Sequence, residues 1–129
     1  MKIFTLLVAL FGLTVGYHPA HAEEAFFPKL ATCIEQSDGV FDSLMRCHQE
    51  EYERQDARVN AAYNKLSAST DPELKEHLAS SQHAWVSFTE EYSSFLYGGT
   101  FGGQLQRLDS MYWLIQATSS RADDLEDAE

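Results

Sequence analysis

The stretch that most limits the fold runs from Cys47 to Leu66, CHQEEYERQDARVNAAYNKL. It contains no Pro or Gly, and its apolar and aromatic residues recur at steps of three or four. This spacing predicts a long amphipathic helix, whose apolar stripe begins at about Val40. In the middle of the stripe stand the polar residues Gln55 and Asp56, and a charged side chain there needs a partner if it is buried.

Two further helices follow the first. Asp71 and Pro72 suit the cap and the first position of a helix, and its apolar stripe consists of Leu74, Leu78, Ser81, Trp85, Phe88, Tyr92 and Phe95. The glycine-rich segment from Tyr97 to Gly103 interrupts the pattern. A third helix is expected from about Gln104, and the acidic tail DDLEDAE is expected to fray.

The predicted fold is therefore all-α. We expect a small three-helix bundle that consists of a long first helix followed by a helical hairpin, because the connections are short and no strand-like alternation is present. Before the first helix, residues 23–29 are expected to be an irregular lead-in, and Leu30 to Gln36 a short helical turn that carries Cys33. Ser37 to Gly39 has the composition of a turn.

The first 22 residues have the features of a secretory signal peptide. Lys2 supplies a positive charge, Ile3 to Val15 is apolar or small, and Ala20-His21-Ala22 is a typical cleavage site. The apolar segment is too short to span a membrane, and no cysteine follows the cleavage site to carry a lipid. We therefore predict a signal peptide at 1–22 and one soluble helical domain at 23–129, periplasmic or secreted.

The chain has two cysteines, Cys33 and Cys47. In an exported protein they are expected to form one disulfide. It would close a loop of about 15 residues and stabilise the fold by roughly 3 kcal/mol.

The chain is strongly acidic, with a formal net charge of −11, and removal of the signal peptide takes away Lys2 and no acid. Nucleic acid is disfavoured as a partner because binding to phosphates needs positive charge, and we predict none. A basic protein partner fits better, since opposite charges accelerate encounter. The alternative is that the acidity only keeps a small exported domain soluble.

Several of these residues resemble a family pattern. Its first part, C…C…E…D..LN..Y..L, resembles Cys33, Cys47, Glu51, Asp56, Val59-Asn60, Tyr63 and Leu66. Its later parts, Q..W..F, a GG-S/T loop and T..R...L, resemble Gln82, Trp85 and Phe88, then Gly98-Gly99-Thr100, then Thr118, Arg121 and Leu125. The pattern is that of the LprI-type lysozyme inhibitor family, and the resemblance covers nearly the whole predicted mature chain.

This resemblance implies a small, exported, helical protein with a disulfide, and for the member that gave the family its name it implies binding and inhibition of lysozyme. Many members carry a second cysteine pair, and in this chain the corresponding places are Ser93 and roughly Trp113. The helical hairpin therefore lacks one cross-link of the family.

An enzyme is not supported. Adjacent carboxylates such as Glu90-Glu91 point to different faces of a helix and do not flank a common substrate atom. The serines have no recognisable His and Asp partners. Glu73, His77 and His83 are at most a partial zinc site, because a further convincing ligand is missing. We predict no catalytic residue, no metal and no cofactor.

Two groups of residues remain as candidate sites. The first is a half-buried polar network of Asp56, Asn60, Tyr63, Gln82, Trp85 and Arg121, in which Arg121 is expected to reach across the bundle to Asp56. Asn60 and Gln82 would complete it. A structural role, fixing the register of the helices, is favoured here over a ligand site.

The second candidate is the loop made of Tyr97, Gly98, Gly99, Thr100 and Phe101, whose aromatic rings could insert into a groove of a partner. The alternative is a plain connection with both rings packed on the core. The predicted function is binding and inhibition of a cationic lysozyme or other cell-wall hydrolase. Two alternatives stay open: a periplasmic accessory protein that binds another envelope protein without inhibition, and an immunity-type partner of a toxin.

Overall fold

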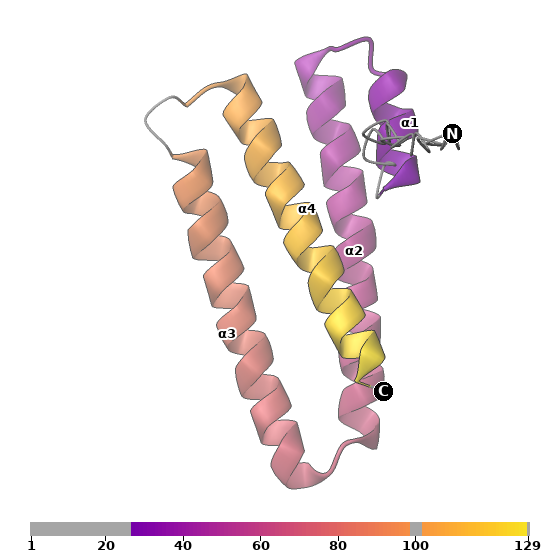
Figure 1. Ribbon diagram of the computed structural model, residues 1–129, viewed down its shortest axis with the longest axis vertical. Helices are drawn as coiled ribbons and strands as arrows, with labels where there is room; N and C mark the ends of the chain where they lie inside the picture. Colours follow the sequence, from indigo (N-terminus) through magenta and orange to yellow (C-terminus); the bar gives the residue numbers. More distant parts are fainter. Residues whose placement is uncertain (1–26, 99–101, 129) are drawn as a thin grey trace, which may run out of the picture.

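The computed structural model describes residues 27–98 and 102–128, and this part of the chain forms four helices and no strand. They are α1 (Pro28–Glu35), α2 (Phe41–Ser69), α3 (Pro72–Tyr97) and α4 (Gln104–Asp127), shown in Figure 1. The all-α fold class is confirmed, but the prediction of three helices is wrong by one. The predicted signal peptide and three residues of the predicted loop, Gly99, Thr100 and Phe101, lie outside the described residues.

The additional helix is α1, where the sequence analysis predicted only a short helical turn. Pro28 does not interrupt the chain there but occupies the start of the helix, where its missing N–H is not needed. Leu30 and the preceding Phe27 are buried against Cys47 and Ile115. This burial, and not the helical propensity of eight residues, stabilises so short a helix.

The predicted disulfide is confirmed: Cys33 of α1 is bonded to Cys47 of α2, with 5.6 Å between the Cα atoms. The chain reverses between the two helices at the predicted turn. Asp38 and Gly39 have φ angles of 52° and 72°, the left-handed conformation that Gly and Asp tolerate best.

The core lies mainly between α2 and α4. With 29 residues, α2 is about 43 Å long and supplies one side of two separate apolar clusters. One consists of Phe27, Leu30, Cys47 and Ile115. The other consists of Val59, Ala62, Ala122 and Leu125.

The expectation that the acidic tail frays is wrong, because α4 continues to Asp127. Ala122 and Leu125 are buried in the second apolar cluster, with 0% and 2% of their surface exposed. These two apolar side chains hold the last turns of the helix on α2 despite the surrounding acidic residues.

Helix α3 begins as predicted, because the Asp71 side chain accepts a hydrogen bond of 3.0 Å from the backbone N–H of Glu73. Figure 1 shows α4 lying between α2 and α3. The extensive helix–helix interfaces are accordingly those of α2 with α4, α3 with α4 and α1 with α2. Along the whole of α3, Thr89 is the one buried residue, so this helix lies on the protein as an outer layer.

Candidate functional site

The predicted polar network divides into two separate parts. On α2, Asn60 Nδ2 donates to Asp56 Oδ2 over 2.9 Å. Between α3 and α4, Arg121 Nε donates to Gln82 Oε1 over 2.9 Å, and its Nη2 donates to Ser81 Oγ over 3.2 Å. In the described part of the chain Arg121 forms no ion pair with Asp56. The expected reach across to α2 is therefore not made, because Arg121 faces α3.

The two aromatic residues of that predicted network contact other parts of the protein. Tyr63 packs against the second apolar cluster, next to Val59 and Leu125. Trp85 is half-buried on α3, and its backbone carbonyl accepts a 3.1 Å hydrogen bond from Thr89 Oγ1. These positions fit a structural role.

A different polar network, which the sequence analysis missed, joins α2 to α4. It consists of Glu51, Arg54, Gln55, Arg58, Asp123 and Glu126. At its buried end Glu51 is 3% exposed. Its carboxylate accepts from Arg54 Nη2 at 2.6 Å, from Arg54 Nε at 3.0 Å and from Gln55 Nε2 at 2.7 Å.

Arg58 connects this end to α4. Its Nη1 donates to Gln55 Oε1 over 2.8 Å, and its Nη2 donates to Glu126 over 2.6 Å and to Asp123 over 2.7 Å. The hydrogen bonds that Arg58 donates to the carboxylates of Glu126 and Asp123 raise its pKa above the ordinary value. The spacing of three or four residues along α2 signals the local pairs, but the partners on α4 depend on how the two helices are aligned.

Carboxylates on two helices shift the pKa of Tyr52. Burial raises the pKa of the Tyr52 hydroxyl, and the negative charges of Asp56 on α2 and Glu90 on α3 raise it further. Asp56 therefore contributes to an acidic environment shared by α2 and α3, although it does not pair with Arg121.

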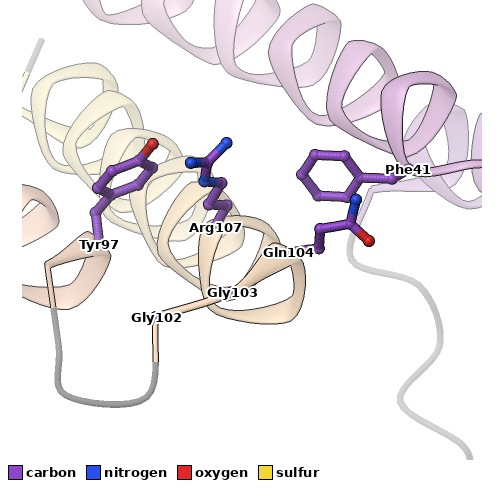
Figure 2. A pocket seen from close by; sticks show the side chains of 6 residues that line it. All are labelled: Phe41, Tyr97, Gly102, Gly103, Gln104 and Arg107. Atoms are coloured by element: carbon purple, nitrogen blue, oxygen red, sulfur yellow. The ribbon is translucent and has the colours of Figure 1, made fainter.

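The end of the molecule that carries the predicted loop is partly described. The Tyr97 ring is 51% exposed, and its centroid lies 5.1 Å from Cζ of Arg107, a cation–π contact. Gly98 ends α3 with a 2.9 Å hydrogen bond from its N–H to the Ser94 carbonyl. Figure 2 shows Tyr97 and Arg107 side by side, with Phe41 on the opposite wall of a cavity of about 430 Å³. Tyr97 is therefore presented at the surface.

A second exposed feature is a group of aromatic rings on one side of the α3–α4 pair. We call Phe88, Tyr92, Phe95 and Trp113 the aromatic face. The Tyr92 ring lies 4.7 Å from Trp113, 5.7 Å from Phe88 and 5.9 Å from Phe95, measured between centroids. Phe88 and Phe95 nevertheless remain 58% and 70% exposed. The sequence analysis assigned the α3 residues to a single apolar stripe and could not separate the exposed rings from those that face α4.

Two kinds of feature are absent from the described residues, namely a metal-binding group and a membrane-spanning helix. Across residues 27–98 and 102–128, no three His, Cys, Asp or Glu side chains gather in a way that could hold a metal ion. Among the helices of this part of the chain, none has a stretch long and apolar enough to cross a bilayer. What the described surface does present is an exposed aromatic face and an exposed, positioned tyrosine.

Comparison with protein families gives a match over most of the chain. The model of the family described as Lysozyme inhibitor LprI matches residues 33–125. The match begins at Cys33 of the disulfide and ends at Leu125 of the second apolar cluster, so it spans most of the chain and nearly all of the described fold. Comparison with curated proteins and with solved structures found no match.

Proposed function

Since the chain belongs to the LprI lysozyme inhibitor family, we propose that it is an exported protein that binds a lysozyme or a related cell-wall hydrolase and inhibits it. The observation that carries this proposal is the family match over residues 33–125. The protein is then a binding protein and not an enzyme.

The composition supports a basic partner. With a net charge of −11, the chain attracts cationic proteins and accelerates their encounter at low salt. Cell-wall hydrolases that carry positive charge meet this condition.

Export is supported by two features of the chain. The signal peptide proposed at residues 1–22 would direct it out of the cytoplasm. The disulfide between Cys33 and Cys47 needs an oxidising compartment to persist. Both are consistent with a periplasmic or secreted protein that meets hydrolases at the cell wall.

We propose obstruction of the substrate cleft as the mechanism. The loop made of Tyr97, Gly98, Gly99, Thr100 and Phe101 connects α3 to α4 at one end of the molecule. In this proposal it enters the saccharide-binding cleft of the hydrolase. Tyr97 supports the idea because it is 51% exposed and its contact with Arg107 restrains the ring before binding.

The test is an assay of cell-wall hydrolysis by purified basic lysozymes, with and without the oxidised protein comprising residues 23–129, at low and moderate salt. We expect saturable inhibition that weakens as salt rises, because exposed charges are screened. Absence of inhibition for every lysozyme tested would refute the proposal. It would favour an accessory protein of the envelope or an immunity-type partner, to be identified by its own binding partner.

The loop is tested separately with Tyr97→Ala. We expect weaker inhibition, with Leu74→Ala as the control because Leu74 is similarly exposed at 59% and lies at the opposite end of α3. Equal inhibition by both variants would refute the role of Tyr97 and leave inhibition itself unaffected.

A further inference from the structure

The aromatic face exposes more apolar area than a single hydrophobic residue on a protein surface does. Three of its rings, Phe88, Tyr92 and Phe95, are 58%, 38% and 70% exposed. Since a buried aromatic side chain covers 150–250 Å², these rings together leave on the order of 300 Å² of contiguous apolar surface in water. Patches of this size on soluble proteins are commonly interaction sites.

Within the described part of the chain these rings are covered only in part, by one another and by Trp113. Helix α3 has an extensive interface with α4 only, and that interface uses Thr89, Ser93 and Leu96 on a neighbouring side of the helix. Phe88 and Tyr92 lie beside this interface and contact Trp113 at its edge, and Phe95 contacts Tyr92.

A hollow adjoins the aromatic face on α4. It has a volume of about 570 Å³ and is lined by Leu96, Leu105, Gln106, Asp109, Ser110 and Trp113. Leu105 is 77% exposed, so the hollow opens to solvent. Its wall therefore combines apolar surface, an indole ring and the Asp109 carboxylate.

This combination suits a lysine or arginine side chain of a partner. The apolar stem can lie along Leu105, while the cationic group approaches the Asp109 carboxylate and the face of Trp113. The aromatic face consists of Trp, Tyr and Phe side chains. These residue types are enriched in the centres of protein interfaces.

The net negative charge of α3 and α4 indicates which kind of partner the aromatic face attracts. Helices α3 and α4 together carry nine acidic residues against Lys75, Arg107 and Arg121. A second copy of the chain would bring the same negative charge to the interface and be repelled. A basic protein is attracted.

We propose that the aromatic face is the surface on which a basic protein docks, with a lysine or arginine of that protein in the hollow beside Asp109. Resting on the proposed function, this protein is the inhibited hydrolase. The aromatic face and Tyr97 then engage the same partner from the end of the α3–α4 hairpin.

The experiment measures the dissociation constant for a purified basic lysozyme, at two salt concentrations, with the oxidised protein comprising residues 23–129. The first variant combines Phe88→Ser with Phe95→Ser. Its control is Leu74→Ser, because Leu74 is an exposed apolar residue on the same helix, about 21 Å from Phe88 along the axis. We expect the double variant to raise the dissociation constant at least about tenfold. The control should change it less than about twofold.

The second variant is Asp109→Asn, with Asp124→Asn as its control because both carboxylates are exposed on α4. We expect Asp109→Asn to weaken binding severalfold at low salt and to reduce the salt dependence. Asp124→Asn should do neither to the same degree. Circular dichroism and thermal melting establish that each variant is folded.

The outcomes separate the two proposals. If the wild type binds and inhibits lysozyme but the double variant does so equally well, the docking surface proposed here is wrong and the proposed function stands. If no lysozyme binds the wild type, both are wrong. If light scattering finds a dimer of the wild type and a monomer of the double variant, the occupant is a second copy of the chain and the proposal of a basic partner is overturned.

Discussion

Substitution of Glu51 by Ala should destabilise the fold strongly, although Glu51 is a charged residue on a helix that faces solvent along much of its length. Its side chain is 4% exposed and accepts three hydrogen bonds, two from Arg54 and one from Gln55. Removing the carboxylate leaves both partners without their acceptor.

The magnitude follows from the burial of each partner. Gln55 is 8% exposed, so its unpaired amide should cost about 1–3 kcal/mol. The Arg54 side chain is 34% exposed and can turn to water, so its lost ion pair should add no more than about 1 kcal/mol. The sum is roughly 1–4 kcal/mol, which lowers the melting temperature of a domain of this size by roughly 5–20 °C.

Urea unfolding followed by circular dichroism measures this difference. The matched control is Glu50→Ala, because Glu50 is exposed one position earlier on the same helix and its loss should change stability by less than about 0.5 kcal/mol. Glu51→Gln keeps an acceptor for Gln55 and should fall between the two. If Glu51→Ala and Glu50→Ala unfold at the same urea concentration, the buried network does not stabilise the fold as described.

Three further changes have defined outcomes. Replacing Cys33 and Cys47 by Ser should lower the free energy of unfolding by roughly 3 kcal/mol, and an unchanged urea midpoint would contradict this. Burial and neighbouring carboxylates raise the pKa of Tyr52 above the ordinary 10.0, so the folded chain holds this proton more tightly than the unfolded chain. The stability that the neutral Tyr52 hydroxyl contributes is intact below about pH 10 and is lost as pH rises through the folded-state pKa. Tyr52→Phe should therefore become more stable relative to the wild type above about pH 10. Identical pH dependence of the two unfolding free energies would refute the shift. Arg121→Ala removes the contact with Gln82 and should lower the free energy of unfolding by about 1 kcal/mol. It should also accelerate amide hydrogen exchange in α3 more than in α2. A variant that melts and exchanges like the wild type would show that the contact does not contribute to stability.

Local signals in the sequence were sufficient for much of the fold. The cap at Asp71 and the apolar period of α2 depend on residues close together in the chain, and the structure has both helices near the expected bounds. The pairing of Cys33 with Cys47 needed no geometry because the chain has two cysteines. The helix α1 was underestimated because its stability comes from burial of Phe27 and Leu30 on residues distant in the chain.

The candidate sites were harder to predict because they depend on the alignment of helices. Helical spacing places Arg121 on a face of α4, but only the packing decides whether that face meets α3 or α2. For the same reason Arg58 was not connected to Asp123 and Glu126, more than 60 residues later in the chain. The apolar pattern of α3 likewise does not reveal that Phe88 and Phe95 stay exposed.

The position of α4 between α2 and α3 has a consequence for how the protein is made. A chain that is synthesised, or passes through a membrane pore, from its N-terminus can first form only the interface of α1 with α2. The other two extensive interfaces need residues 104–127. The order of helices therefore delays two of the three extensive interfaces of the described fold until the last helix is present. During that interval the apolar side of α2 is uncovered, and the emerging chain is a natural client for chaperones.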